Sequence, residues 1–450
     1  MKKWNLFLMA LLVFISACTS TAPQPAATVT PTAVPATPSD RIYVDAGRVE
    51  GSLNPALYGS NYGPWLFVAM EVRPQAEAAG IRLLRFPGGR WGDENDIDTW
   101  QLDQFMQLAR AMGSEPLVHV RLLKGTPEKA AALVKYANIE KGYKIRYWSV
   151  GNEANLYVNQ FKVDYDTERF NREWREIAKA MKAVDPTILL VGPDTSQFMV
   201  NEASNPKDKN GVDWLRSFLK ANGDMVDVVA VHRYPFPNNA EKTSPTRQEL
   251  LANGPDWDAW APALRKVIKE ETGRDLPIAL TEVNSNWAGQ SGGEATPETF
   301  VNGLWWGDVL TRLVRQRVDM VAQFCLVTRP GTGEWGLLAR DDVRPIYYVY
   351  LMYKQFGSEL VFSNSPDPLV TVAAALRQDG ALTVMLVNRG DAAVNLPLRV
   401  DGFGDSRKSE YWLFDVDHKA EKQDNMNVPA DGPISLPPAS MNLLVFHPAK

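Results

Sequence analysis

Cysteine is scarce in this sequence, with 2 among 450 residues, and this excludes a disulfide framework. Neither sign of charge is in large excess. The 48 Lys and Arg stand against 53 Asp and Glu, and a formal charge of −5 argues against a nucleic-acid partner. No His-x-x-x-His, Cys-x-x-Cys or Gly-x-x-x-x-Gly-Lys spacing occurs, so neither zinc nor a nucleotide is predicted, and we expect no cofactor.

Apolar residues are plentiful at 45%, with 22% charged, which is the composition of a soluble globular protein with a large core. That content excludes disorder over most of the chain. The length predicts one large domain with a smaller one, or two to three domains. Tryptophan is the unusual component, because 14 are more than a core of this size needs.

The N-terminal segment predicts an export signal followed by an extended tether. Two lysines precede an apolar run, 6–14, that is too short to span a bilayer but suits a signal peptide over 1–18. It ends in Ile-Ser-Ala-Cys, which resembles the bacterial lipobox, where the cysteine (here Cys18) is lipidated. Residues 19–40 contain five prolines among Thr, Ala and Ser, and such a segment stays extended. We therefore expect an exported cell-surface lipoprotein that touches the membrane only through its anchor; a plain secretory signal is the alternative.

Short apolar segments alternate with amphipathic ones over residues 57–357. Several, such as 188–191 and 228–231, lack a polar face, as expected of parallel strands buried on both sides. Residues 167–184 carry apolar residues at steps of three and four, which marks one helix face. Eight such units predict a (β/α)8 TIM barrel, whereas a doubly wound sheet would need a glycine-rich phosphate turn that is absent. The strands are expected to end near Asn61, Phe86, Val120, Asn152, Gly192, His232, Glu282 and Val327, with further helices over 102–112, 128–136, 257–269, 300–316 and 345–356.

The pattern changes over residues 358–450. Short apolar runs separated by Gly, Asp, Asn and Pro replace the helical period, and they predict a small antiparallel β-sandwich. Residues 41–56 precede the barrel, and the strand expected at 42–44 could join this second domain. The other strands are expected at 370–375, 382–388, 394–400, 411–414 and 441–447.

Two glutamates end predicted barrel strands. Glu153 closes the fourth strand segment and Glu282 closes the seventh. Active sites of such barrels lie at the carboxyl ends of the strands, so both side chains are expected in one pocket. Two carboxyls facing each other are what glycosidic bond cleavage needs, with one protonating the leaving oxygen and the other attacking the anomeric carbon. A salt-bridged loop residue is the alternative for either glutamate taken alone.

These residues resemble the clan A retaining glycoside hydrolases. Asn152-Glu153 matches the Asn-Glu pair of that clan, which implies an acid/base Glu153 and a sugar contact from Asn152. Glu282 matches the strand-seven nucleophile. The resemblance further implies that Tyr234, in His232-Arg233-Tyr234, hydrogen-bonds the nucleophile and that Arg85 lies beside it.

The surrounding motifs resemble particular families of the clan. Arg-Phe-Pro-Gly-Gly (85–89), Gly-Thr-Pro-Glu (125–128) and the segment 147–153 are similar to family 51 arabinofuranosidases. Trp-Gly-Leu-Leu (335–338) followed by Arg-Pro (344–345) is also similar to families 39 and 79, the xylosidases, iduronidases and glucuronidases. Arg90 replaces the usual Asn of family 51, and Ala154 replaces the usual Pro of family 39. The resemblance therefore indicates the clan but no single family within it.

Other residues are candidates for a supporting role. Trp65, Trp91, Trp287 and Trp335 lie in or beside strand-end loops, where an indole can stack on a sugar or pack within the loop. His232 and His119 are candidate substrate contacts, or satisfied barrel histidines, and His418 and His447 are expected to have no role. Arg90 or Arg121 could contact an acidic sugar. The oxygen-rich segment 93–98 lacks the Gly and distal Glu of a calcium loop, so a helix N-cap is expected there.

The leading hypothesis is a retaining glycosidase acting on a poly- or oligosaccharide. Burial and the second carboxylate are expected to keep the acid protonated, and a carboxyl separation of about 5–5.5 Å is expected rather than the 6.5–9.5 Å of inverting enzymes. A solute-binding lipoprotein with two lobes and a glycan-binding barrel without activity are the rivals. The sequence alone predicts neither the sugar and linkage, nor exo or endo action, nor the oligomeric state.

Overall fold

The computed structural model describes residues 1, 38–236, 244–289, 291–328, 335–404, 408–428 and 433–448. Cys18, the predicted signal peptide beyond Met1 and most of the predicted tether lie outside the described residues. Within the described ranges, no helix combines the length and the apolar character needed to cross a membrane.

Eight parallel strands close into a barrel in chain order, from β2 to β9 and back to β2. The predicted (β/α)8 barrel is confirmed. Its strands are apolar on both faces because Leu83, Val191 and Ala279 fill the barrel interior, while their neighbours Leu84 and Leu190 pack outward against helices. The strands are β2 Gly59–Asn61, β3 Leu83–Phe86, β4 Glu115–Val120, β5 Tyr147–Val150, β6 Leu189–Thr195, β7 Val228–Arg233, β8 Ile278–Val283 and β9 Met320–Gln323.

Two strand ends differ from the prediction. The last strand was expected to end near Val327, but β9 ends at Gln323. The apolar segment after it leaves the barrel, because the N–H of Leu326 donates to Asn61 O at 2.8 Å and Val327 bridges to Leu338. In contrast, β6 runs past the expected Gly192 to Thr195, because pairing with β7 continues there.

Along the chain, helices alternate with the barrel strands, and they pack on the outside of the barrel. Helix α6 shows how the sequence specifies them. The predicted helix over 167–184 is confirmed as α6 Thr167–Val184. It begins where the Asp166 side chain accepts the N–H of Arg169, and its buried residues Phe170, Trp174 and Met181 follow the helical period. The other α-helices are α1 Arg73–Ala78, α2 Trp91–Glu94, α3 Thr99–Met112, α4 Pro127–Val134, α5 Tyr157–Phe161, α7 Trp214–Asn222, α8 Arg247–Ala252, α9 Trp260–Thr272, α10 Phe300–Arg315 and α11 Pro345–Lys354.

Nine strands form the second structure in the order β15-β14-β17-β12-β11-β10-β1-β13-β16. The pairs are antiparallel except β1 with β13, and residues from both halves of the sheet enclose one apolar core, so the predicted β-sandwich is confirmed. β10, β15 and β16 were not expected. β15 is mostly exposed and charged, so it lacks an apolar alternation. The strands are β1 Ile42–Ser52, β10 Glu359–Asn364, β11 Val370–Leu376, β12 Leu382–Asn388, β13 Val394–Asp401, β14 Lys408–Phe414, β15 Lys419–Asn427, β16 Pro433–Leu436 and β17 Ser440–Phe446.

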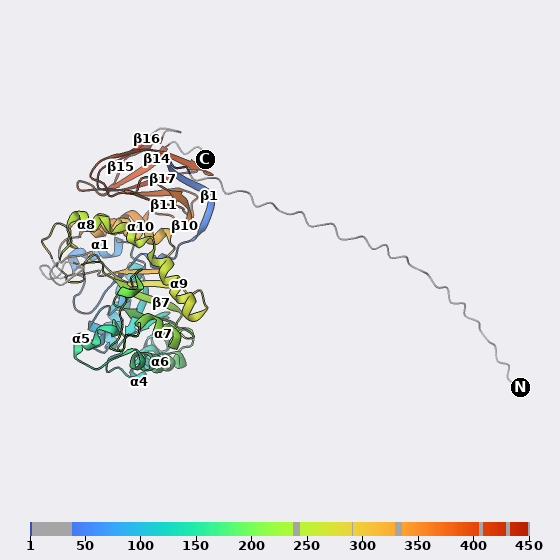
Figure 1. The fold of residues 1–450 in the computed structure, drawn as a ribbon, viewed down its shortest axis with the longest axis vertical. Helices are drawn as coiled ribbons and strands as arrows, with labels where there is room; N and C mark the ends of the chain where they lie inside the picture. Colours follow the sequence, from blue (N-terminus) through green and yellow to red (C-terminus); the bar gives the residue numbers. More distant parts are fainter. Residues whose placement is uncertain are drawn as a thin grey trace. The chain divides into compact units, whose positions relative to one another are not determined.

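The barrel and the sandwich share a buried junction along α10. Residues 302–314 of this helix are buried all round, because one side faces the barrel and the other faces β11 and β12 (Figure 1). β11 serves both cores, with Val372 directed to the sandwich and Ala373 to the junction.

Four polar residues are buried at this junction, and we call Asp308, Arg312, Thr371 and Arg389 the junction cluster. Asp308 Oδ2 lies 3.0 Å from Arg312 Nε and 3.3 Å from Arg389 Nε, and Oδ1 accepts a hydrogen bond from the Thr371 hydroxyl. Arg312 Nη2 also donates to Thr371 Oγ1 at 2.8 Å, and Arg389 Nη1 donates to the backbone oxygen of Leu251 at 2.7 Å. The cluster therefore ties the sandwich to the barrel through ionic hydrogen bonds.

Candidate active site

Polar side chains replace apolar ones where the barrel interior reaches the carboxyl ends of the strands. Arg85 on β3, His119 on β4 and His232 on β7 each come two residues after an inward apolar side chain. Successive strand residues point to opposite faces, so all three side chains point inward. None of the three side chains has exposed surface. Arg85 and His232 contact the two candidate glutamates from below.

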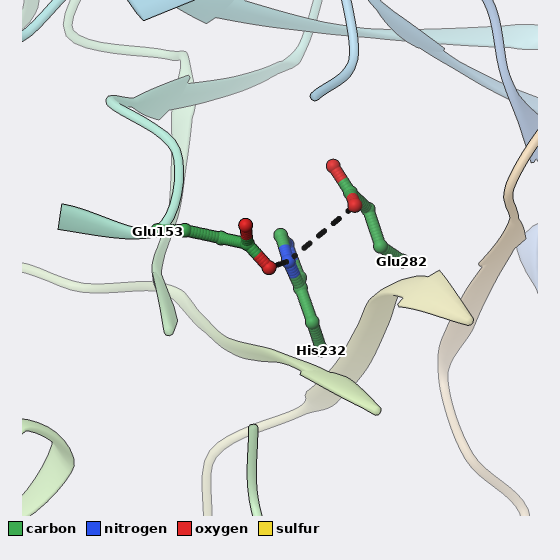
Figure 2. A group of neighbouring side chains, drawn as sticks. All are labelled: Glu153, His232 and Glu282. Carbon is green, nitrogen blue, oxygen red and sulfur yellow. Dashed lines mark hydrogen bonds and ion pairs between the residues drawn. The ribbon is translucent and has the colours of Figure 1, made fainter. Parts of the chain in front are cut away.

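Glu153, three residues after the end of β5, and Glu282, in β8, lie on either side of His232 (Figure 2). His232 Nδ1 is 2.9 Å from Glu153 Oε1 and 3.7 Å from Glu282 Oε2. One oxygen of each glutamate and one nitrogen of His232 all lie within 4.8 Å of one another. The side chains of Glu153 and Glu282 are 15% and 5% exposed, so Glu153 is the one more open to a ligand.

Glu282 is held by two donors. Arg85 Nη1 donates to Glu282 Oε1 at 2.8 Å, and the Tyr234 hydroxyl donates to Oε2 at 2.9 Å. Burial and the Glu282 carboxylate raise the pKa of Tyr234 far above its ordinary value, so the hydroxyl remains a donor. Both contacts stabilise the carboxylate form of Glu282.

The backbone around Glu153 is held in a conformation that few side chains adopt. Glu153 has φ 47° and Asp194, at the end of the neighbouring strand β6, has φ 55°. The two residues are joined directly, since the N–H of Glu153 donates to the Asp194 carbonyl at 2.9 Å. Gly151 has φ 77°, and a Cβ there would lie 2.7 Å from Leu122 Cβ, so the approach to Glu153 requires glycine. Left-handed residues without glycine's freedom concentrate at functional sites.

Asp194 is a site residue that the sequence did not predict. It is fully buried and accepts a hydrogen bond from the Thr281 hydroxyl. Its carboxylate lies 3.3 Å from Arg85 Nη2 and 3.8 Å from His232 Nε2. Burial alone would raise the pKa of Asp194, but Arg85 and His232 outweigh it and hold the pKa below the usual range. The available signal was a carboxylate two residues beyond an apolar strand. We call Arg85, Glu153, Asp194, His232 and Glu282 the active-site cluster.

Burial and the excess of carboxylates over cations determine which groups of the cluster hold a proton. Burial raises the pKa of Glu153; His232 and Arg85 oppose this, and Glu282 adds to it. Burial lowers the pKa of His232, but the carboxylates of Glu282, Asp194 and Glu153 outweigh it and raise the pKa to about 9. The hydrogen-bonded His232–Glu153 pair therefore holds at least one proton near neutral pH.

Asn152 and Asp93 support the cluster from one side. Asn152 Oδ1 accepts from Arg85 Nη2 at 2.8 Å, and its backbone N–H donates to Asp93 Oδ1 at 3.1 Å. Asp93 is buried and also accepts the Tyr157 hydroxyl proton. Asp98, at the end of the same segment, forms a capping box with α3, which confirms the N-cap expected there.

Asn61 was expected as a strand end and not as a site residue. Its Nδ2 donates to the carbonyls of Thr281 and Ala322, both at 2.9 Å, and its Oδ1 accepts from Arg85 Nη1 at 3.0 Å. It therefore links the first, seventh and eighth barrel strands and orients Arg85. Strand-end position was the only signal in the sequence.

An aromatic hollow of about 360 Å³ adjoins Glu282. A Cβ on Gly89, which lines the hollow, would lie 3.7 Å from Glu282 Oε1. Trp65 and Trp335 flank Phe324, with ring centroids 6.1 and 5.7 Å away. The lining residues are Trp65, Gly88, Gly89, Arg90, Trp91, Phe324, Cys325, Val327, Thr328 and Trp335. Three of the four candidate tryptophans are thus gathered at one place.

The remaining candidates lie elsewhere or are already engaged. Trp287 is 55% exposed and does not line the hollow, and His119 is fully buried with its ring under Gly92. Arg90 pairs with Glu94 at 2.7 Å. Arg121 Nε donates to the carbonyls of Asp93 and Leu123. His418 and His447 lie in the sandwich, where they contact Asp415 and Glu410.

The trio of Glu153, His232 and Glu282 has the spacing of a possible metal site among the described residues. Their other contacts disfavour that role. Arg85 and Tyr234 already occupy the two oxygens of Glu282, and the Arg85 cation would repel a metal ion. We assign no metal to this cluster.

Comparisons with known proteins show that the chain is similar to glycoside hydrolases. No family model matches the chain. Heparanase of Rattus norvegicus is 25% identical over 261 residues, which cover 57% of this chain and 45% of that protein. The intracellular exo-alpha-(1->5)-L-arabinofuranosidase 1 of Bacillus subtilis (strain 168) is 23% identical over 479 residues, 86% of this chain and 92% of that protein. These relatives are clan A glycoside hydrolases, the clan that the motifs resemble.

The chain spans about half the length of the heparanases it matches, between 41% and 54%. Among solved structures, CelM2, a bifunctional glucanase-xylanase from a metagenome library, is similar with a TM-score of 0.72 at 17% identity, over 92% of this chain and 100% of that one. At such an identity the likeness shows a shared fold, a barrel with a β-sandwich.

Proposed function

We propose that this protein is a retaining O-glycoside hydrolase with Glu153 as the acid/base and Glu282 as the nucleophile. The observation that carries the proposal is the pairing of two carboxyls in different settings at the strand ends. Glu282 is bound by Arg85 and Tyr234, which favour a carboxylate, whereas burial raises the pKa of Glu153 and favours the acid. Two carboxyls whose environments separate their protonation states are what this chemistry requires.

The reaction follows from these assignments in two steps. Glu282 attacks the anomeric carbon while Glu153 gives its proton to the glycosidic oxygen, so the carbon–oxygen bond breaks and a glycosyl ester forms on Glu282. Glu153, now ionised, takes a proton from water, and the water oxygen displaces Glu282 from the anomeric carbon. Oxygens of the two glutamates within 4.8 Å support retention, because an inverting site must also hold a water between its carboxyls.

The sugar is proposed to bind between Glu153 and the aromatic hollow. The hollow adjoins Glu282, and Trp335 and Phe324 offer ring faces to a sugar. Arg90 is paired with Glu94, so its charge is already compensated. The names of the relatives, heparanase and arabinofuranosidase, set the range of sugars to test.

The test is a panel of aryl glycosides that includes α-L-arabinofuranosides, β-D-xylosides, β-D-glucosides and β-D-glucuronides. Glu153→Ala should lose activity toward poor leaving groups, and with activated aryl leaving groups, which need no proton, it should regain turnover when azide is added, giving a glycosyl azide. Glu168→Ala, an exposed glutamate on α6, is the matched control and should behave like the wild type. Trp335→Ala should raise KM more than it lowers kcat.

Two results would oppose the proposal. Undiminished hydrolysis by Glu282→Gly would remove the nucleophile assignment. Binding of glycans without turnover across the panel would favour the rival of a barrel without activity. The other rival, a solute-binding protein with two lobes, is excluded by the closed barrel.

We further propose that the protein is exported and anchored to the cell surface at Cys18. The support is the sequence alone, namely an apolar run followed by Ile-Ser-Ala-Cys and a proline-rich tether. Expression in a bacterium with radiolabelled palmitate should label the wild type and not Cys18→Ala. Equal labelling of both proteins would contradict the anchor.

A further inference from the structure

Asp194 contacts every part of the active-site cluster except the Glu282 carboxylate. Its side chain lies 3.3 Å from Arg85 Nη2 and 3.8 Å from His232 Nε2, and its backbone carbonyl accepts from the N–H of Glu153. The residue has no exposed surface. It can therefore act on the reaction only through the groups that it holds.

Arg85 alone does not explain a carboxylate at this place. The guanidinium already donates to Glu282, to Asn61 and to Asn152 at 2.8–3.0 Å, and its contact with Asp194 is the longest of the four. Fixing Arg85 needs polar atoms, which these partners supply. A further buried charge calls for another explanation, because an unneeded buried ion is costly.

His232 supplies that explanation. Nδ1 is bonded to Glu153 at 2.9 Å, whereas Nε2 is buried without a hydrogen-bond partner and faces Asp194 Oδ1. The imidazole ring thus lies between two carboxyl groups, one at each nitrogen. A carboxylate at that distance stabilises the imidazolium form, while the Arg85 cation destabilises it.

We propose that Asp194 is a positioning residue that keeps the catalytic proton on the His232–Glu153 pair. This inference rests on the proposed glycosidase function. In the resting site the His232–Glu153 pair shares one proton across the Nδ1–Oε1 contact. When the glycosidic oxygen arrives, Glu153 gives this proton to the leaving oxygen, which leaves His232 neutral and Glu153 ionised. The water of the second step returns one proton to Glu153.

Other titratable groups also face the His232–Glu153 pair, and the test must separate their effect on its titration from that of Asp194. Arg85 and Glu282 lie in the cluster, and His119 and Tyr234 are electrostatically coupled to it. The groups are Arg85 from β3, Asp93 from α2, His119 from β4, Asp194 from β6, Tyr234 after β7, Glu282 from β8 and Cys325 after β9. Of these, Asp194 is the carboxylate aimed at His232 Nε2, so removing its charge acts on the pair directly.

The experiment compares Asp194→Asn with the wild type in two readouts. The basic limb of the pH profile of kcat/KM should move to lower pH by about one unit, because the pair loses a stabilising negative charge. The His232 imidazole, followed by NMR, should titrate at correspondingly lower pH. The chain has 4 histidines, so His232→Asn identifies the signal.

Two variants control for structural damage. Asp194→Glu retains the carboxylate, so the limb should stay within about half a unit even where kcat falls. Asp227→Asn removes one charge at the opposite end of the barrel, where Asp227 Oδ2 accepts from Leu190 N, and should leave the profile unchanged. A simple loss of packing lowers kcat without moving the limb.

The outcomes separate this inference from the proposed function. If the wild type hydrolyses glycosides but Asp194→Asn leaves the limb and the His232 titration in place, the inference is overturned and the function stands. A wild-type His232 that titrates at or below 6.5 overturns it without any variant. If no glycoside is hydrolysed, the proposed function fails, while the NMR titration still tests the effect of Asp194 on His232.

Discussion

The protein buries two ionic clusters that use the same side chains for different purposes. In the junction cluster one carboxylate, Asp308, faces two guanidiniums, Arg312 and Arg389, with exposures of 0%, 6% and 4%. Arg312 has a second carboxylate partner, Asp258, that is half exposed. The cations here equal or outnumber the carboxylates, and the Thr371 hydroxyl and the Leu251 carbonyl accept further hydrogen bonds from the guanidiniums. Such a cluster has no reason to hold a mobile proton.

The active-site cluster has the opposite balance. Three carboxyls, Glu153, Asp194 and Glu282, face the permanent cation Arg85 and the imidazole of His232. With more carboxyls than fixed cations, the cluster must bind a proton to approach neutrality. Burial raises the pKa of Glu153, and the carboxylates raise that of His232 to about 9. Both clusters are buried, so the charge balance, and not burial, distinguishes the candidate active site from the junction.

Neutralising Glu282 should affect activity far more than stability. We expect Glu282→Gln to lower kcat by about 10⁴-fold or more, because the attacking carboxylate is removed. The free energy of unfolding should stay within about 1 kcal/mol of wild type, since the cluster loses an excess negative charge. Steady-state kinetics and urea denaturation measure the two effects. A large stability loss with modest loss of activity would show that Glu282 is structural.

The reverse effect is expected at the junction. Asp308→Ala leaves Arg312 and Arg389 buried without their shared carboxylate, and we expect a loss of about 3–5 kcal/mol in the free energy of unfolding. The kcat of the folded fraction should remain close to wild type. Urea denaturation gives the first quantity and active-site titration the second.

Asp401→Ala provides the matched control for this variant. Asp401 forms a partly exposed pair with Arg399 in the sandwich, 2.9 Å apart, and its removal should cost about 1 kcal/mol or less. A similar cost at both positions would show that the junction cluster contributes no more than a surface pair.

The pH dependence of stability should trace to the active-site cluster. The folded pKa of His232, about 9, lies above the unfolded value near 6.5, so its stabilising contribution is complete below pH 6.5 and is lost as the pH rises through 9. The change is expected to be of the order of 3 kcal/mol at most. Urea denaturation between pH 6 and 9.5 should show this fall in the wild type. His232→Asn should flatten the curve, while Asp308→Asn should keep it.

The sequence predicted the residues that strand geometry places at the site and missed those that depend on contacts. Glu153 closely follows the apolar strand β5 and Glu282 lies near the end of the apolar strand β8, so the barrel alone brings them together. Asp194 was missed because its strand continues past the apolar run, and only the pairing of β6 with β7 reveals it. Its value to the site lies in contacts with Arg85 and His232, which are distant in the sequence.

The fold shows the same division. Helix α6 was predicted to the residue because its apolar period and its Asp166 cap are local signals. The end of β9 was misplaced because the apolar residues after Gln323 pack over the barrel end instead of extending the strand. Edge strand β15 carries charged residues and has no pattern of its own, so only its pairing with β14 defines it.

The smallest expected effect tests whether the two clusters are independent. No side chain belongs to both, and no described hydrogen bond or ion pair joins a member of one to a member of the other. We therefore expect the stability changes of Glu282→Gln and Asp308→Asn to add in the double variant within about 0.5 kcal/mol. The double variant's urea denaturation curve at pH 7 gives the coupling free energy. A coupling above about 1 kcal/mol would mean that the sandwich, through α10, alters the barrel interior. The junction would then act on the active site as well as holding the domains together, and the distinction drawn from charge balance would fail.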